Sequence, residues 1–190
     1  FGNQDPNLSM VYIRGEGGGA ILNRKGKLRK LNLKNANMIS SSVYYGFSPS
    51  GKYVTFSTNI IIPAFHANAE KRLEVYDSKS DVYVADLDNN RIISSPLTSD
   101  STKLETFPTF SPNGAYIYYC AADRKGLNTK NLKGLKYSLV RIPFDEENGK
   151  FGEKVDTLYT ARSVCHPKIS PDGRYCLFTV ADYGTFPIWH

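Results

Sequence analysis

Short runs of aromatic and β-branched residues, separated by polar turns, recur along the chain and are typical of β-strands. Three pairs of such runs flank the same kind of turn: Ser48-Pro49-Ser50-Gly51, Ser111-Pro112-Asn113-Gly114 and Ser170-Pro171-Asp172-Gly173. Serine can accept hydrogen bonds from the local backbone, proline fixes φ for a type I turn, and glycine suits the fourth position. Each copy therefore predicts a hairpin of strand A, a tight turn and strand B.

The turns lie 63 and 59 residues apart (48 to 111, and 111 to 170), and near-equal spacing is the signature of a repeat architecture. Further apolar runs predict strands C and D, at 81–87 and 91–95 in the first unit and at 137–142 and 154–159 in the second. Pro108 and Pro167 fall inside strands A, where a central strand would lose a ladder hydrogen bond, so strand A is predicted at an edge. Four antiparallel strands per unit predict β-propeller blades, with strand A at the central channel.

The repeat also resembles a known family. The pattern of an aromatic, a proline, a second aromatic and Ser-Pro-Asp-Gly before an apolar strand is similar to the TolB-type β-propeller repeat, and Ala85-Asp86-Leu87 and Pro96-Leu97-Thr98 match the family's blade ending. The resemblance covers most of residues 38–180. Ile169 departs from it, where an aromatic is usual, as does a long insert over Asn59–Ser80. The resemblance implies a propeller fold and a periplasmic location, but this blade also occurs in transport-system proteins, peptidase accessory domains and some lyases.

The expected fold is all-β, with two complete and two partial blades. The complete blades are predicted at 38–100 and 101–160, and the partial ones at 1–37 and 161–190. In the first partial blade, strands are expected over Leu8–Arg14, Gly19–Leu22 and Lys27–Leu33. A closed ring needs about 4–8 blades. The chain is therefore expected to be a segment of a longer propeller, or to complete a ring by self-association, and both alternatives stay open.

Composition is that of an ordinary β protein, with 41% hydrophobic residues and 13 tyrosines. No run approaches the ~20 apolar residues of a membrane-spanning helix, and no signal peptide is visible. Three cysteines do not make a disulfide framework, and packed free thiols are expected, with a Cys120–Cys165 bond as the alternative. Aligning the last hairpin places Cys176 opposite Pro167 and Cys165 opposite Phe178.

The net charge of +6 is moderate, and basic residues gather in two groups. Either group can attract an anionic partner, or can simply protect a solvated edge strand. Few aromatic residues interleave with them, which argues against nucleic-acid binding. The groups are Arg24, Lys25, Lys27, Arg29, Lys30 and Lys34, and Arg124, Lys125, Lys130, Lys133 and Lys136.

Three histidines are the most suggestive chemical feature. His66 and His190 follow the first and third strands B, and His166 lies early in a strand A, so all three are expected near one face. They form a candidate metal site. The preferred interpretation is structural, with Phe65 and Trp189 closing the blade tops, and no cofactor is expected.

The loop-bearing face is the expected working surface. The insert Asn59–Ser80, the basic loop Ala122–Lys136 and the connection Thr98–Glu105 should share it, and long connections are usually functional or disordered. No nucleophile elbow, phosphate-binding loop or paired-carboxylate motif is present. The hypothesis is a non-catalytic scaffold that binds a protein or peptide; the alternative is the propeller domain of a larger enzyme, either a serine-peptidase gating domain or a sugar lyase with rim histidines. The expected partner-binding residues are Phe65, His66, Arg124, Lys125, His166, Trp189 and His190.

Overall fold

The computed structural model describes residues 10–13, 19–31, 42–65, 73–127 and 134–180, and in these ranges the chain is almost entirely antiparallel β-sheet. Sheet 1 contains β1 (Met10–Ile13), β2 (Ala20–Asn23) and β3 (Leu28–Lys30). Sheet 2 contains β4 (Ser42–Phe47), β5 (Tyr53–Phe65), β6 (Leu73–Asp86) and β7 (Arg91–Ile93), in that order.

Sheet 3 begins with β8 (Lys103–Phe110), β9 (Tyr116–Asp123) and β10 (Ser138–Asp145). Its fourth strand is split into β11 (Lys150–Phe151) and β12 (Asp156–Tyr159), which both pair with β10. Sheet 4 contains β13 (Val164–Ile169) and β14 (Cys176–Val180). The predicted all-β fold and the predicted order of strands A to D in sheets 2 and 3 are confirmed, whereas the division into blades at the proposed boundaries remains a prediction.

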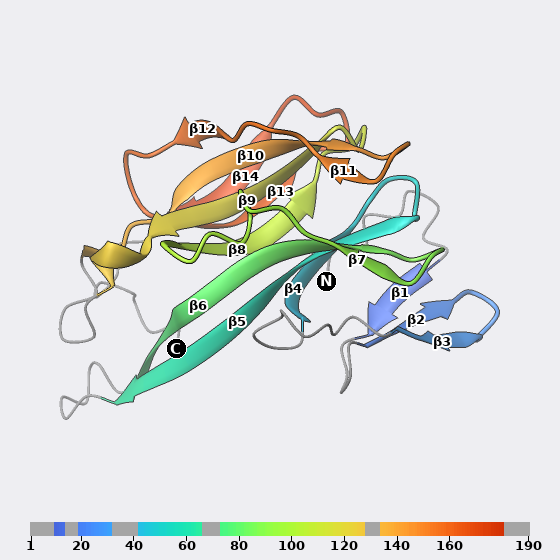
Figure 1. The fold of residues 1–190 in the computed structure, drawn as a ribbon, viewed down its shortest axis with the longest axis horizontal. Coiled ribbons are helices and arrows are strands. Elements are labelled where there is room, and N and C mark those ends of the chain that lie inside the picture. The colour runs from blue at the N-terminus through green and yellow to red at the C-terminus, as the bar shows by residue number, and fades with distance from the viewer. Residues whose placement is uncertain (1–9, 14–18, 32–41, 66–72, 128–133, 181–190) are drawn as a thin grey trace.

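The sheets pack face to face in chain order (Figure 1). Ile21 of sheet 1 packs in one core with Phe47 and Phe56 of sheet 2. Tyr53 and Val84 of sheet 2 share a second core with sheet 3. A third core joins sheets 3 and 4. The middle sheets therefore bury apolar side chains on both faces, as the propeller prediction required.

The three Ser-Pro-x-Gly turns have one hydrogen-bond pattern. The carbonyl groups of Ser48, Ser111 and Ser170 accept from the N–H of the turn glycine at 3.0, 3.0 and 2.8 Å. Each serine Oγ also accepts from the N–H group five residues later, at 3.3, 2.9 and 3.0 Å. The turn glycines have φ of 71°, 73° and 73°, in the left-handed region. The turn chemistry predicted from the sequence is confirmed.

The predicted register of the last hairpin is wrong. Cys176 lies opposite Ile169, and Cys165 lies opposite Thr179. The alignment failed because six residues separate the paired ends of the hairpin at the turn, and because a bulge shifts the register between Cys165 and Lys168. The expectation of packed thiols is confirmed: Cys120, Cys165 and Cys176 are free, and Cys120 is buried. Burial raises the pKa of all three thiols.

No helix in the ranges that the structure describes is long and apolar enough to cross a membrane.

Candidate functional site

An aromatic cluster joins β4, β8 and β13, the first strands of sheets 2, 3 and 4. Tyr44, Phe107 and His166 each stand four residues before the serine of a tight turn. The ring centroids of Phe107 and His166 are 4.1 Å apart, and those of Tyr44 and Phe107 are 4.4 Å apart. Tyr44 also meets His166 edge-on at 5.8 Å. One repeat position therefore supplies all three rings, which lie on β4, β8 and β13, the first strands of their sheets.

The backbone at two of these positions is unusual. Phe107 has φ of 55° and His166 has φ of 52°, a region that bulky side chains rarely occupy. Both residues lie in β-bulges and precede a proline, which disfavours the right-handed helical conformation. The bulges turn the two rings toward each other.

His166 is a neutral ring in this cluster. Burial against the neighbouring rings, and then the nearby Lys168 ammonium, lower the pKa of the imidazole below its usual 6.5. Burial likewise lowers the pKa of Lys168. At pH 7 His166 is therefore available for stacking and hydrogen bonding, but not as a permanent positive charge.

A polar layer lies between sheets 2 and 3 beside the aromatic cluster. Ser57 Oγ lies 2.9 Å from Asn59 Oδ1, and Asn59 Nδ2 donates to Thr106 Oγ1 at 3.0 Å. Asp77 belongs to the same layer, and burial raises its pKa to about 6 against the opposing effect of hydrogen bonds from Asn59 and Tyr137. The layer ties the two sheets together by polar contacts as well as by the apolar core.

Glu105 on β8 is fully buried at this interface, and neither carboxyl oxygen has a hydrogen-bond partner among the described residues. Burial raises its pKa to about 8, and the nearby carboxylates of Asp81 and Asp100 add to the effect. Glu105 is therefore mostly protonated at neutral pH. In the described ranges no group of three or more His, Cys, Asp or Glu residues is arranged to hold a metal ion.

The long insert predicted over Asn59–Ser80 is mostly a β-ribbon, which corrects its interpretation as a loop. β5 and β6 pair continuously from Tyr53↔Asp86 to Phe65↔Leu73, apart from one bulge. β4 pairs with β5 only as far as Thr58, and β7 pairs with β6 only over Val84–Asp86. Beyond those limits the ribbon formed by 59–65 and 73–80, here called the arm, extends past the ends of β4 and β7 (Figure 1), and Asn59 at its base hydrogen-bonds to Thr106 of sheet 3.

The arm carries three consecutive isoleucines that are open to solvent. Ile60, Ile61 and Ile62 are 38%, 44% and 38% exposed. Three β-branched residues in a row favour the extended chain. Pro63 follows them, and a proline is tolerated here because the arm has no third strand among the described residues. The arm is thus a two-stranded ribbon on which three neighbouring isoleucines are partly exposed.

Arg124 and Lys125 lie in a short 3-10 helix, η3 (Arg124–Gly126), directly after β9. Asp123 caps it by accepting from the Lys125 N–H at 2.8 Å. The Arg124 N–H donates to the Thr102 carbonyl at 2.9 Å, and its guanidinium donates to the Ser101 carbonyl at 3.4 Å. Two of the three connections expected on the loop-bearing face are therefore in contact.

The structure places some of the predicted partner-binding residues, and others lie outside the described ranges. His166 belongs to the aromatic cluster, and Arg124 and Lys125 lie in η3. Phe65 ends β5, and only its backbone is described. The remaining three predicted residues, His66, Trp189 and His190, lie outside the described ranges, and so does the candidate metal site that needed two of them.

Sequence reasoning missed several features. It passed over Tyr44 and Phe107 as partners of His166, although their equal distance from the turn serines was a usable signal. It also gave no role to buried Glu105. The exposed isoleucines were hidden in what was interpreted as a loop.

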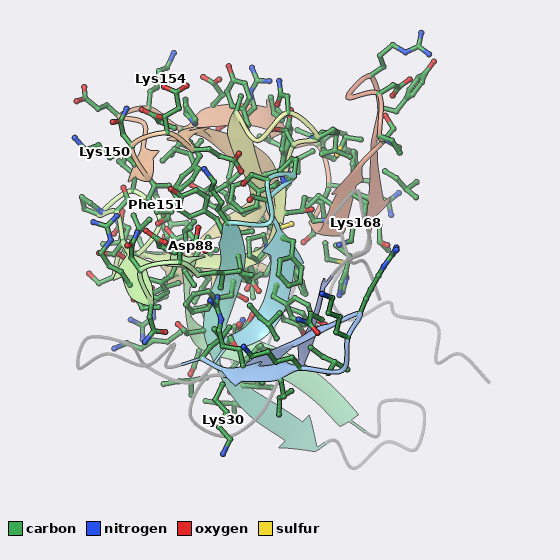
Figure 2. The ribbon with its side chains drawn as sticks, turned by 90° about the vertical axis from the view of Figure 1, so that its right-hand side faces the viewer. Lys30, Asp88, Lys150, Phe151, Lys154 and Lys168 are labelled. Carbon is green, nitrogen blue, oxygen red and sulfur yellow. The ribbon has the colours of Figure 1, made fainter. Side chains whose placement is uncertain are left out.

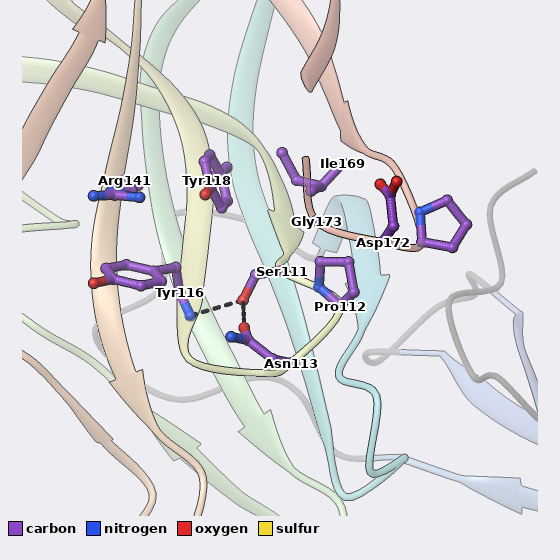
Figure 3. A pocket seen from close by; sticks show the side chains of 10 residues that line it. Ser111, Pro112, Asn113, Tyr116, Tyr118, Arg141, Ile169, Asp172 and Gly173 are labelled. Carbon is purple, nitrogen blue, oxygen red and sulfur yellow. Dashed lines mark hydrogen bonds between the residues drawn. The ribbon is translucent and has the colours of Figure 1, made fainter. Parts of the chain in front are cut away.

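A pocket of about 390 Å³ opens at the tight-turn end between sheets 3 and 4, where little surface for binding was expected (Figure 3). Arg141 stacks over Tyr116 at 4.3 Å, and its Nε lies 3.4 Å from Asp156 Oδ2. The Ser111 hydroxyl is hydrogen-bonded to Asn113 Oδ1 at 2.7 Å. Its partner is therefore an amide oxygen and not a general base. The lining residues are Ser111, Pro112, Asn113, Tyr116, Tyr118, Arg141, Ile169, Pro171, Asp172 and Gly173.

The equivalent place between sheets 2 and 3 is filled. Tyr53 corresponds to Tyr116 at the repeat distance of 63 residues, and it packs edge-on against Phe144 at 5.2 Å. The Tyr53 hydroxyl donates to the Glu146 carbonyl at 3.0 Å. The pocket is therefore a part of the sheet-to-sheet interface that is less completely packed, and the arrangement of its side chains suggests no catalytic chemistry.

Comparisons with known proteins agree on the fold. No protein-family model matches the sequence, and no curated protein matches it. TolB from Acinetobacter baumannii is similar over 95% of this chain and 37% of its own, with a TM-score of 0.56 and 15% identity. Kuenenia stuttgartiensis hydrazine synthase is similar over 93% of this chain and 48% of its own, with a TM-score of 0.57 and 12% identity. The chain spans less than half of either protein, and the likeness shows a TolB-like β-propeller fold.

Proposed function

We propose that this chain is a non-catalytic propeller scaffold that binds a protein partner at its loop-bearing end, in the periplasm. The arm is the observation that carries the proposal. The periplasmic location rests on the resemblance of the repeat to the TolB type.

The arm supports a protein partner because neither β4 nor β7 extends along it, so its outer part is a ribbon of two strands only. A two-stranded ribbon is marginally stable in water unless another surface packs on it. Fully burying an exposed large aliphatic side chain contributes roughly 1.5–3 kcal/mol. Ile60, Ile61 and Ile62 are 38%, 44% and 38% exposed, so each offers a partner a fraction of that value. Alternation along a strand places Ile60 and Ile62 on one face of the arm and Ile61 on the other, so a partner can make apolar contact from either face. The occupant that fits is a protein surface with an apolar groove.

The state of the described polar groups supports a non-catalytic role. The His166 ring packs against Phe107, Glu105 is buried away from solvent, and the Ser111 hydroxyl is hydrogen-bonded to Asn113. In the described ranges these groups are not arranged as a nucleophile with a base.

The test is a pull-down from periplasmic extract with the immobilised protein and a triple variant, Ile60→Ser, Ile61→Ser and Ile62→Ser. The matched control is Leu158→Ser, Tyr175→Ser and Leu177→Ser, which changes three other exposed apolar residues. The arm variant should lose the retained protein while its unfolding midpoint stays close to that of the parent chain. Retention by the arm variant, or an equal loss in the control, would contradict the proposal.

A further inference from the structure

Almost all of the net charge of this protein lies on one hairpin. Residues 20–31, here called the basic hairpin, contain five Lys or Arg and no Asp or Glu. The chain has 24 basic and 18 acidic residues, a net charge of +6, so the hairpin holds +5 and the rest, with 19 basic and 18 acidic residues, holds +1. Such a concentration creates a strong local positive potential. The five residues are Arg24, Lys25, Lys27, Arg29 and Lys30.

The turn of the basic hairpin is fixed by its own sequence. Asn23 Oδ1 accepts from the N–H groups of Lys25 at 3.0 Å and Lys27 at 2.9 Å. Gly26 takes φ of 75° and donates its N–H to the Asn23 carbonyl at 3.0 Å. The positions of the lysines therefore do not depend on a partner.

The lysines of the basic hairpin are presented to solvent. Every residue from Arg24 to Lys30 is exposed, and Lys30 extends away from the ribbon (Figure 2). Arg29 is anchored, since its guanidinium donates to the Leu87 carbonyl at 2.6 Å. Lys25, Lys27 and Lys30 have no ion pair among the described residues. Leu28 lies among them and is 52% exposed.

We propose that the basic hairpin binds the surface of an anionic phospholipid bilayer, with Lys25, Lys27 and Lys30 at the lipid phosphates and Leu28 in the interfacial region. Charge complementarity favours this occupant, because each Lys or Arg near an anionic bilayer adds to the attraction. An exposed leucine beside the cations supplies a second, apolar contact. Single-stranded nucleic acid fits less well, because the hairpin contains no aromatic residue for bases to stack on.

Lysines also protect an edge strand from pairing with another chain, and β3 is an edge strand. Glutamate protects an edge equally well but repels an anionic bilayer. Charge reversal therefore separates the two roles.

The experiment measures co-sedimentation of the protein with vesicles of phosphatidylcholine and phosphatidylglycerol, and with vesicles of phosphatidylcholine alone. The variant is Lys25→Glu, Lys27→Glu and Lys30→Glu. The matched control, Lys52→Glu, Lys136→Glu and Lys150→Glu, makes the same change in net charge at other exposed lysines. Each lost cation should weaken binding by about fivefold, so the hairpin variant should lose roughly a hundredfold or more, and the control much less.

In the parent chain, binding should require phosphatidylglycerol and weaken steeply as salt is raised. A tryptophan in the Leu28→Trp variant should shift its fluorescence to shorter wavelength with anionic vesicles alone. The proposal is overturned if the parent chain does not bind these vesicles, or if the hairpin and control variants lose binding equally. Tighter binding to a 20-nucleotide single strand than to the vesicles would assign the hairpin to nucleic acid instead.

Discussion

Glu105 is a single residue that makes the folded state sensitive to pH. Its pKa is raised from 4.5 to about 8 because the carboxyl group is buried between sheets 2 and 3. Between those values the folded protein holds a proton that the unfolded chain has released. Stability must therefore fall as pH rises through this window. Asp77, with its pKa raised to about 6, acts in the same direction at lower pH.

We expect Glu105→Gln to remove the loss of stability between pH 6.5 and 8, because glutamine stays neutral. One group can change the free energy of unfolding by at most about 1.4 kcal/mol per pH unit. Urea unfolding across this range measures the slope, with Glu147→Gln at an exposed position as the control. An unchanged slope in Glu105→Gln would show that this carboxyl group does not titrate as described.

Phe110 is a single residue whose truncation tests the apolar core between sheets 2 and 3. It is 2% exposed and packs edge-on against Phe144 at 5.5 Å. Phe110→Ala should lower the free energy of unfolding by about 3–5 kcal/mol, since it leaves a cavity between two sheets. Leu177→Ala, at a site that is 77% exposed, should change it by less than about 0.5 kcal/mol. A loss below about 1 kcal/mol for Phe110→Ala in chemical denaturation would contradict the packing.

At the scale of elements, the tight turns repeat in backbone geometry but differ in surroundings. Gly114 and Gly173 both have φ of 73°. A Cβ at Gly114 would lie 2.7 Å from Glu146 Cδ, whereas a Cβ at Gly173 would meet nothing within 4 Å. Glu146 also accepts from Ser50 Oγ at 3.2 Å, so it connects the turns of sheets 2 and 3.

Both glycine-to-alanine changes should therefore destabilise the protein, by about 1–2 kcal/mol for the left-handed backbone. Gly114→Ala should lower the free energy of unfolding by about 0.5–1 kcal/mol more than Gly173→Ala, because Glu146 must move and lose its hydrogen bond from Ser50. Thermal unfolding of the two variants gives the difference. Adding Glu146→Ala to Gly114→Ala should remove the additional destabilisation. If Gly114→Ala and Gly173→Ala destabilise the protein equally, the contact with Glu146 is ruled out.

Elements whose conformation is set by residues at that point of the chain were predictable from the sequence. The turns follow from Ser, Pro and Gly at fixed positions, and strand A is an edge strand because Pro108 and Pro167 cannot donate to a ladder. The arm was missed because the Ile60–Ile62 run is followed by Pro63, and because its pairing partners at 76–79 are mostly polar and give no strand signal of their own. The bulges at Phe107 and His166 shift registers without a clear local signal. The aromatic cluster depends on those bulges and on how three sheets stack.

At the scale of the whole molecule, the sheets stack in sequence and leave two ends with different character. One end carries the tight turns and a pocket of about 390 Å³. The other end carries the arm and η3 (Figure 1). A stack of packed sheets that presents a ribbon with three exposed isoleucines suits a scaffold, because binding segments act most effectively when a stable core positions them.

The most direct test of this account is photo-crosslinking from the arm. A benzophenone amino acid replaces Ile61 in one variant and Lys52, at a tight turn, in the other, and each is irradiated in periplasmic extract. The account predicts a specific adduct from position 61 that excess unlabelled protein suppresses, and none from position 52. A specific adduct from position 52 and none from position 61 would contradict the assignment of the arm as the partner-binding surface.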